Sequence, residues 1–362
     1  MRLEGLLKYF AKLEKRLSKN IVLIVEALMK SVSANTAQIA LALGELEKKN
    51  YKASDMQVYR LLSNDKFKVG KVMFRGYIKL IFAQLRERTK LKKGDKVYIQ
   101  VDFTSERDNF LILMASVLIS DKAIPLYFSM RNYPKKKGQY SQKKMEAAFI
   151  QALRSYLSRQ YRYVLLADRG FGNDRFIKLC ETFDFDYIIR VEPNLKISYQ
   201  ARTGIMSTIL NRNGKFSVEI LAWNKTVTLV RNKIKKSVWF IVTNLALVNQ
   251  QQGIDGYARR FAIEKFFQDL KSSGFNLEHS KIRDYARFKR LLFLCCFAYS
   301  LLFLLGDVVA EKYPELKKKL TSPYKPVYSL FQLAKRLITF YEKLAFRILY
   351  DFFQCFILSV GE

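Results

Sequence analysis

Histidine and cysteine are scarce in this chain, which contains one histidine, His279, and four cysteines among 362 residues. A single histidine nearly excludes a catalytic His base or a His-rich metal site, and we expect His279 to be structural. The cysteines show neither zinc-ligand spacing nor a disulfide framework; they are Cys180, Cys295, Cys296 and Cys355. Together these absences indicate a reducing, cytosolic environment.

Apolar runs long enough to cross a membrane are also missing. The best candidate, residues 291–305, is about fifteen residues long, whereas a span needs roughly twenty. The N-terminus has no uninterrupted apolar stretch and so does not look like a signal peptide. We therefore expect a buried core helix at 291–305 and a soluble, cytoplasmic protein with no membrane partner.

Positive charge, in contrast, is abundant: 64 Lys and Arg stand against 32 Asp and Glu, a formal net charge of +32. Half of the residues are apolar and 14% are aromatic, which indicates a folded chain. A folded chain with this excess repels itself unless it binds a polyanion, and nucleic acid is the usual one. A membrane surface is the alternative that charge alone leaves open.

Helical periodicity runs through residues 1–92, which we predict to form a helical DNA-binding domain. Its apolar residues recur at three- and four-residue intervals in the segments 4–17, 20–31, 36–48, 55–64 and 70–88. The third and fourth segments are compatible with a helix-turn-helix that directs Gln57, Arg60 and Asn64 toward DNA. A plain helical bundle has the same pattern, so both interpretations stay open.

From residue 93 the pattern predicts a mixed α/β sheet with helices on its faces. Three strands come in succession, followed by helix, strand, helix and strand. The strands are KVYIQVDF, FLILMASVLI, AIPLYFSMRNY, RYVLLAD and DFDYIIRV, and the helices cover about 143–158 and 174–183.

Residues 194–248 alternate in short segments between Asn, Gly and Lys turns, which predicts a small antiparallel β insertion. A helix with a polar face begins at about 249, and the apolar helix 283–305 follows it. We accordingly assign 93–193 and 249–310 to one α/β domain, 194–248 to the insertion and 311–362 to a helical C-terminal region.

Tyr257, Arg260, Glu264 and Lys271 have the spacing Y-x2-R-x3-E-x6-K. At 100° per helical residue they share an arc of about 60° on one face. One carboxylate is thus flanked by two cations and a phenol, as in a site that holds a metal and a phosphate. A solvated Arg–Glu pair at i,i+4 spacing has the same pattern, so the helix alone does not decide.

Two aspartates stand where predicted strands end. Asp102 lies at the finish of KVYIQVDF, and Asp168 leads into a turn that contains Gly170 and Gly172. Singly, each is typical of a turn former or a helix cap. The glycines, however, let the backbone approach another group closely, and Arg169 adds a cation beside Asp168.

Three carboxylates from a central strand, a neighbouring strand and a later helix can converge on one point. Oxygen-only ligands suit Mg²⁺ or Mn²⁺ and argue against zinc. Two such ions, roughly 3.5–4 Å apart, would activate a water and stabilise the leaving 3′ oxygen of a phosphoryl displacement. This chemistry requires no histidine.

With Asp102, Asp168 in the string ADRGF, and Glu264 in the complete Tyr-Arg-Glu-Lys signature, the chain resembles a DDE transposase. The group it most resembles is the insertion sequence four family of bacterial cut-and-paste transposases. The resemblance covers roughly residues 95–305 and implies an RNase H-like catalytic fold that is interrupted by the β insertion. The N-terminal helices and the C-terminal tail share with the family only a helical, basic character.

The resemblance also implies residue roles. Asp102, Asp168 and Glu264 would be the catalytic residues and would bind two Mg²⁺ or Mn²⁺ ions. Arg260 and Lys271 would hold backbone phosphates near the cut transposon end.

In relatives that cut through a DNA hairpin, a flipped base rests on a tryptophan of the β insertion. Trp223 and Trp239 are the two tryptophans of this chain, and both lie in that region. Trp239 sits in a predicted strand and is compatible with a core position, whereas Trp223, next to a turn, is the better stacking candidate. Tyr257 would contact a phosphate or the displaced base.

Further basic residues are candidate DNA contacts. Arg169 lies beside Asp168 at the predicted site. Lys135, Lys136 and Lys137 form a run that is either solvated or bound to the DNA backbone.

The predicted protein is a transposase that binds double-stranded DNA, both the terminal inverted repeats of its insertion sequence and the target, and carries out cut-and-paste transposition. Pairing two ends requires a homodimer in the synaptic complex, at the nucleoid of a bacterial cytoplasm. The alternative is a catalytically silent, transposase-derived DNA-binding protein or repressor. The terminal repeat, the target sequence and the cleavage route stay open.

Overall fold

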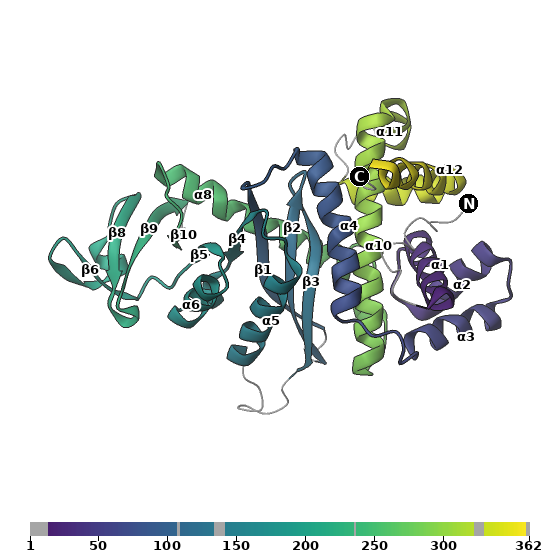
Figure 1. The fold of residues 1–362 in the computed structure, drawn as a ribbon, viewed down its shortest axis with the longest axis horizontal. Helices are drawn as coiled ribbons and strands as arrows, with labels where there is room; N and C mark the ends of the chain where they lie inside the picture. The colour runs from purple at the N-terminus through teal and green to yellow at the C-terminus, as the bar shows by residue number, and fades with distance from the viewer. Residues whose placement is uncertain (1–13, 107–108, 134–141, 235–236, 322–328, 360–362) are drawn as a thin grey trace. The chain divides into compact units, whose positions relative to one another are not determined.

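The structure, a computed structural model, describes residues 14–106, 109–133, 142–234, 237–321 and 329–359 (Figure 1). The chain divides into two compact units, one made of residues 85–266 and the other of residues 1–84 with 267–362. The boundaries of these units differ from those of the four regions predicted from sequence, because residues 267–310 pack with the N-terminal helices. The four regions are defined by their expected functions, and this division of the chain stays a prediction.

Residues 85–266 are built on a mixed sheet whose first five strands have the order β3-β2-β1-β4-β5. The first three strands are antiparallel neighbours, whereas β4 and β5 run parallel to β1. This is the strand order of an RNase H-like fold, as expected from the sequence. The strands are β1 (Lys96–Glu106), β2 (Phe110–Ile119), β3 (Lys122–Asn132), β4 (Arg162–Ala167) and β5 (Asp186–Arg190).

The predicted β insertion continues this sheet. Its last strand pairs antiparallel with β5, and the sheet extends from there in the order β10-β9-β8-β6-β7. These strands are β6 (Lys196–Tyr199), β7 (Arg202–Ile205), β8 (Gly214–Ile220), β9 (Lys225–Ile234) and β10 (Ser237–Thr243), with a short α7 (Met206–Ile209) after β7. The two ladders therefore form one ten-stranded sheet.

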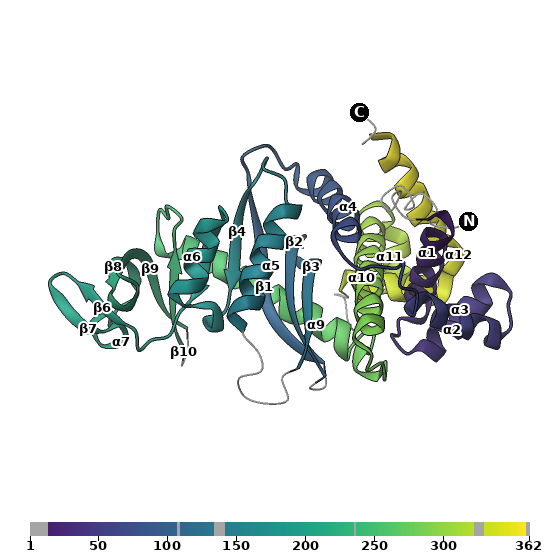
Figure 2. The ribbon, with the colours of Figure 1, turned by 60° about the horizontal axis from the view of Figure 1, so that its bottom comes forward.

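The helices of this unit cover both faces of the sheet (Figure 2). On one face, Tyr127 of β3 packs against Phe149 of α5, with ring centroids 5.0 Å apart. On the other face, Gln100 of β1 donates to the backbone oxygen of Arg259, 3.2 Å away. The helices are α5 (Gln142–Tyr156), α6 (Asp174–Thr182), α8 (Gln250–Ala258) and the first half of α9 (Ala262–Lys271), which continues beyond residue 266 into the other unit. The 3₁₀ turns are η2 (Arg169–Phe171), η3 (Leu221–Trp223) and η4 (Arg259–Phe261).

Residues 1–84 and 267–362 form a helical unit around one long apolar helix. That helix is α10 (Tyr285–Lys312), and Tyr77 reaches its Ser300 with a hydrogen bond of 2.7 Å. Arg290 of α10 donates to the backbone oxygens of Phe67 and Leu62, each at 2.8 Å. The other elements are α1 (Lys15–Ser31), α2 (Thr36–Glu47), α3 (Tyr51–Leu62), α4 (Lys71–Thr89), η5 (Leu277–His279), α11 (Pro314–Leu320) and α12 (Leu330–Ser359).

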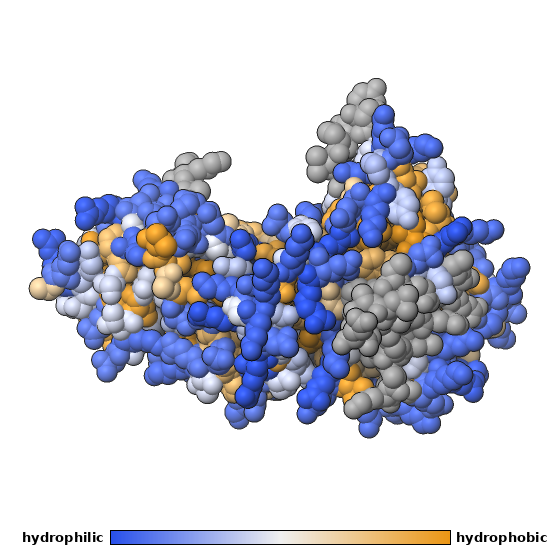
Figure 3. Space-filling model, turned by 45° about the horizontal axis from the view of Figure 1, so that its top comes forward, coloured by the Kyte–Doolittle hydropathy of each residue, from blue (hydrophilic) through white to orange (hydrophobic). Residues whose placement is uncertain are grey.

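In the described part of the chain, α10 is the one helix with the length and apolarity to cross a membrane. Its most apolar window has a mean hydropathy of 2.2, and 94% of that window is buried inside the structure. A core helix has this property, so the buried helix expected at 291–305 is confirmed. Hydrophilic residues cover most of the described surface on the face seen in Figure 3.

Three boundaries differ from the sequence-based expectation. The break expected near residue 18 is absent, because α1 runs without interruption from Lys15 to Ser31. The third helix begins at Tyr51 and not at 55, because Asn50 caps it by accepting from the backbone N–H of Ala53. Strand β1 continues to Glu106, beyond the predicted end at 103, because it stays paired with β2.

Gly172, in the turn after β4, lies where the structure leaves no room for a side chain. Its φ of −75° suits any residue, but a Cβ atom there would lie 2.4 Å from the backbone oxygen of Arg190. We expect Gly172→Ala to lower the free energy of unfolding by about 1–3 kcal/mol, the usual cost of overpacking. Urea denaturation measures it. Gly70→Ala is the control, since nothing lies within 4 Å there; equal stability of the two variants would contradict the prediction.

Candidate active site

Two aspartates lie side by side on neighbouring parallel strands. Val101 of β1 is paired with Ala167 of β4, so Asp102 and Asp168 are the next residues along the two strands. Asp102 is not at the end of its strand, as the sequence suggested, but at the end of the β1–β4 pairing. Its side chain points to the same face as that of Gln100, two residues earlier, because strand side chains alternate.

The turn after β4 orients Asp168. Its Oδ1 accepts the backbone N–H of Gly170 at 3.0 Å, which caps the short turn η2. Phe171 of the same turn stacks on Phe103 of β1, with ring centroids 5.4 Å apart and planes 6° from parallel. The residues after the two aspartates thus hold the turn against β1.

The signature helix is not continuous. It consists of α8, the 3₁₀ turn η4 and α9, so Arg260 lies in the interruption and Glu264 in the first turn of α9. The arc calculated for an ideal helix therefore does not describe the real face. Tyr257 is 1% exposed and belongs to the apolar core between α8 and the sheet, and the Arg260 side chain is 8% exposed. The solvated-face interpretation is wrong for these two residues.

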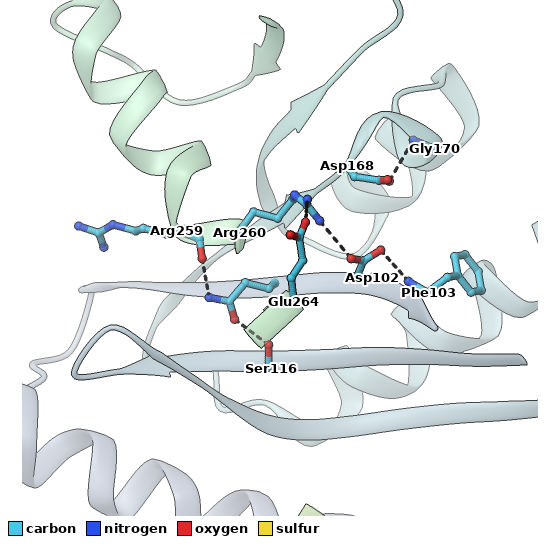
Figure 4. Close-up of polar contacts among 9 residues, drawn as sticks. Asp102, Phe103, Ser116, Asp168, Gly170, Arg259, Arg260 and Glu264 are labelled. Carbon is cyan, nitrogen blue, oxygen red and sulfur yellow. Dashed lines mark hydrogen bonds and ion pairs between the residues drawn. The ribbon is translucent and has the colours of Figure 1, made fainter. Parts of the chain in front are cut away.

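Arg260 joins two of the three acids (Figure 4). Its Nη1 donates to Asp102 Oδ2 at 3.0 Å, and its Nη2 donates to Oε1 of Glu264. A guanidinium therefore lies between Asp102 and Glu264, and the N–H of its buried Nε is left without a partner among the described residues.

The electrostatic balance around Asp102 is unfavourable to its charged form. Burial is the main influence and raises the pKa of Asp102 from 3.8 to about 6. The Arg260 guanidinium and the Phe103 backbone N–H lower this pKa, whereas Asp168 and Glu264 raise it. One cation does not compensate for burial next to two further carboxylates.

An aromatic wall adjoins these acids. The Trp239 ring of β10 lies 5.2 Å from the ring of Tyr257 and 5.7 Å from that of Phe261, and the Arg260 guanidinium lies 4.9 Å from the Phe261 ring. Phe261 is 38% exposed. Sequence reasoning missed it, although it directly follows Arg260 in the signature. Trp223, the preferred stacking candidate, is buried at 7% exposure.

Among the described residues, the remaining predicted DNA contacts do not touch Asp102 or Glu264. Arg169 forms a half-exposed ion pair with Glu192, at 3.2 Å. Lys271 is the last residue of α9 and belongs, like Gln57 and Arg60, to the helical unit. Lys135, Lys136 and Lys137 fall outside the described residues.

The three acids offer only carboxylate oxygens, which are the ligands that a hard divalent cation prefers. A bound cation would also stabilise the charged form of Asp102, which burial and two neighbouring carboxylates disfavour. In the described residues, however, no three His, Cys, Asp or Glu side chains are close enough together to hold one ion. The guanidinium of Arg260 occupies the space between Asp102 and Glu264. The donor set therefore fits a metal, while its positions in this structure fit an arginine.

A family model described as "Transposase DDE domain" matches residues 142–301, less than half of the chain. The match contains Asp168 and the signature from Tyr257 to Lys271, whereas Asp102 precedes it. It supports a DDE transposase, an enzyme that acts on DNA. No curated protein matches the sequence.

Solved structures of endonuclease V are similar to part of this chain. The enzyme of Ciona intestinalis, in complex with a 24mer DNA containing an inosine followed by a ribo-adenosine, is 14% identical over 46% of this chain and 82% of its own, with a TM-score of 0.27. That of Bacillus subtilis is 10% identical over 52% of this chain and 92% of its own, with a TM-score of 0.28. At such TM-scores the fold assignment rests on the strand order itself.

In the metal-free protein we expect Asp102 to titrate near pH 6. Removing a carboxylate by Asp168→Asn should lower this pKa, and removing the cation by Arg260→Gln should raise it. Because the pKa exceeds its unfolded value of 3.8, the folded state binds more protons between those pH values, and the contribution of Asp102 to stability declines as pH rises through this window.

Carboxyl carbon NMR of aspartate-labelled protein follows the titration, and the Asp102→Asn spectrum identifies the signal. Asp121→Asn, at the β2–β3 turn, is the control and should leave the signal unchanged. Titration of Asp102 near its ordinary value would show that the site is not desolvated.

Proposed function

We propose that the chain is a cut-and-paste transposase that binds the terminal inverted repeats of its insertion sequence and cleaves and joins DNA strands with Asp102, Asp168 and Glu264. The observation that carries the proposal is the β1–β4 register, which brings Asp102 and Asp168 together on the face that Glu264 approaches. The match to a transposase DDE domain adds support. DNA is the polyanion that the net charge of +32 requires.

Mg²⁺ or Mn²⁺, as two ions, would be held by Asp102, Asp168 and Glu264. When bound, such ions activate a water or a 3′ hydroxyl and stabilise the leaving oxygen of a phosphoryl transfer. The contribution of the chain is to present oxygen ligands from two strands and one helix. The stack of Phe103 on Phe171 and the cap at Gly170 keep the two strand ligands in place.

Arg260 has two roles in this proposal. Without DNA it is the counter-ion that holds Asp102 and Glu264 together in a partly buried place. With DNA bound, it would contact a phosphate near the cut end, once metal ions take over its role as the counter-ion of the two acids. Lys271 and Arg169 are further phosphate contacts in the proposal.

The aromatic wall gives the DNA end an apolar surface. Trp239 and Tyr257 are mostly covered by their neighbours, and Phe261 presents the exposed ring. A base near the cut end can stack on such a ring, at about 1–3 kcal/mol per base in other single-strand sites. Two chains are needed to pair two ends, so we also propose a homodimer on DNA, in the bacterial cytoplasm.

The triad is tested by Asp102→Ala, Asp168→Ala and Glu264→Ala. We expect each to lower cleavage of element ends in Mn²⁺ by at least about 100-fold, since loss of groups that merely orient metal ligands already costs 10–100-fold. Binding of the same DNA should persist, because the charge of the helical unit is unchanged.

Gel assays of nicking and binding provide the two measurements, with Asp121→Asn as a matched control. Normal cleavage by any of the three variants would remove that residue from the triad. A wild-type protein that binds element ends and never nicks them would favour the catalytically silent repressor instead.

The two roles of Arg260 are separable with Arg260→Gln. In DNA-free protein at pH 8, where Asp102 is ionised, we expect Mn²⁺ to bind roughly tenfold more tightly, because a competing cation 3.0 Å from Asp102 is gone. Strand cleavage should fall, because the phosphate contact is lost.

Titration calorimetry measures the binding of Mn²⁺. The control is Arg259→Gln, which removes the same charge one residue away, where an exposed guanidinium stacks on Tyr98 at 4.5 Å. Unchanged Mn²⁺ affinity in Arg260→Gln would show that the arginine does not compete with the metal.

A further inference from the structure

A hollow of about 540 Å³ opens between α1 and α3 in the helical unit, remote in sequence from the acids. Its wall is formed by the start of α1, the α2–α3 loop, the exposed side of α3 and the loop after α3. The volume is in the range of ligand sites, roughly 300–1,000 Å³. The helices α1, α2 and α3 lie together in Figures 1 and 2.

The hollow concentrates positive charge. Arg16, Lys49, Arg60 and Lys66 line it, against one carboxylate, that of Glu14. Glu14 pairs with Lys66 at 3.3 Å, and Lys49 pairs with Glu47 outside the hollow at 3.4 Å. Within the described part of the chain, neither arginine has a carboxylate partner. Both guanidinium groups are therefore available to an external anion.

Gln57 acts as a brace, in the sense that its side chain links α3 to α1 and to the α2–α3 loop. Its Nε2 donates to Asn20 Oδ1 of α1 at 3.2 Å, and its Oε1 accepts from Lys49 Nζ at 3.1 Å. Both ends of the amide are thus used inside the protein. These two bonds direct the amide of Gln57 toward α1 and Lys49, whereas a helix-turn-helix reader would direct it toward the edge of a base.

We propose that this hollow binds the phosphodiester backbone of duplex DNA, with Arg16 and Arg60 as the principal contacts and Gln57 as a positioning residue. The inference rests on the proposed function and specifies how the N-terminal unit holds DNA: through phosphates, without reading bases. Arg16 and Arg60 are exposed. An exposed cationic wall holds a small anion weakly, whereas a polyanion gains from counterion release at each contact.

The test compares Arg16→Gln/Arg60→Gln with Arg75→Gln/Lys79→Gln, which removes two exposed charges of α4 outside the hollow. Fluorescence anisotropy with a labelled mixed-sequence duplex, between about 50 and 200 mM KCl, gives affinity and salt dependence. We expect the hollow variant to lose roughly tenfold per arginine at 0.1 M salt, and the slope of log affinity against log salt to shallow by about two. The α4 variant should keep the wild-type slope.

Gln57→Ala distinguishes a brace from a base reader. As a brace, its loss lowers affinity for element ends and for mixed-sequence DNA by the same factor, with no change in slope. A loss confined to element ends would show base reading and overturn the positioning role. Thermal unfolding of each variant identifies any that fail to fold.

Two competitors identify other occupants. Inorganic phosphate that displaces DNA from the wild type, and not from the arginine variant, would show a small-anion site and overturn the proposal. Binding to phosphatidylserine vesicles that is lost in the same variant, with DNA binding intact, would overturn it in favour of a membrane headgroup. If the wild type nicks element ends and the arginine variant binds DNA like the control, the hollow proposal fails while the transposase proposal stands.

Discussion

The parallel pairing of β1 with β4 places the two aspartates of the candidate site next to each other. The opposition of Val101 and Ala167 leaves Asp102 and Asp168 next to each other on the face covered by η4. A slip of one residue would turn one aspartate to the face covered by α5, because side chains alternate along a strand. On the same face, the buried amide of Gln100 joins β1 to Ser116 of β2, at 2.8 Å, and to the backbone of Arg259 in η4.

The same face gathers more negative charge than the fold neutralises. Asp102 and Glu264 share one guanidinium, and burial, with the charges of Asp168 and Glu264, raises the pKa of Asp102. The excess of cations elsewhere in the chain gives little relief, because exposed charges beyond a Debye length of about 10 Å are screened. The site is thus locally acidic in a basic protein, an arrangement that attracts the DNA backbone broadly and cations at one point.

Much of the fold could be predicted from sequence. The strand limits of β2 and the helix limits of α6 agree with prediction to within a residue, because apolar runs bounded by turns identify both. The proximity of Asp102 and Asp168 followed from their places near strand ends. The η4 interruption could not be predicted, since its residues are ordinary helix formers and tertiary contacts select the 3₁₀ turn. The ideal-helix calculation consequently put Tyr257 on the polar face, although it is buried. It gave no sign of Phe261, whose ring packs against Trp239 and stays partly exposed.

The pairing of β10 with β5 also has a consequence for how such a chain can change over evolution. The insertion is not a module attached by loops; it shares the backbone ladder that positions Asp168. Additions next to β10 would disturb that ladder directly. The β6–β7 hairpin at the free edge is separated from it by β8 and β9, so its length can vary without a change in register at the acids. We therefore expect the strands around β5 and β10 to resist insertions and the β6–β7 edge to accept them.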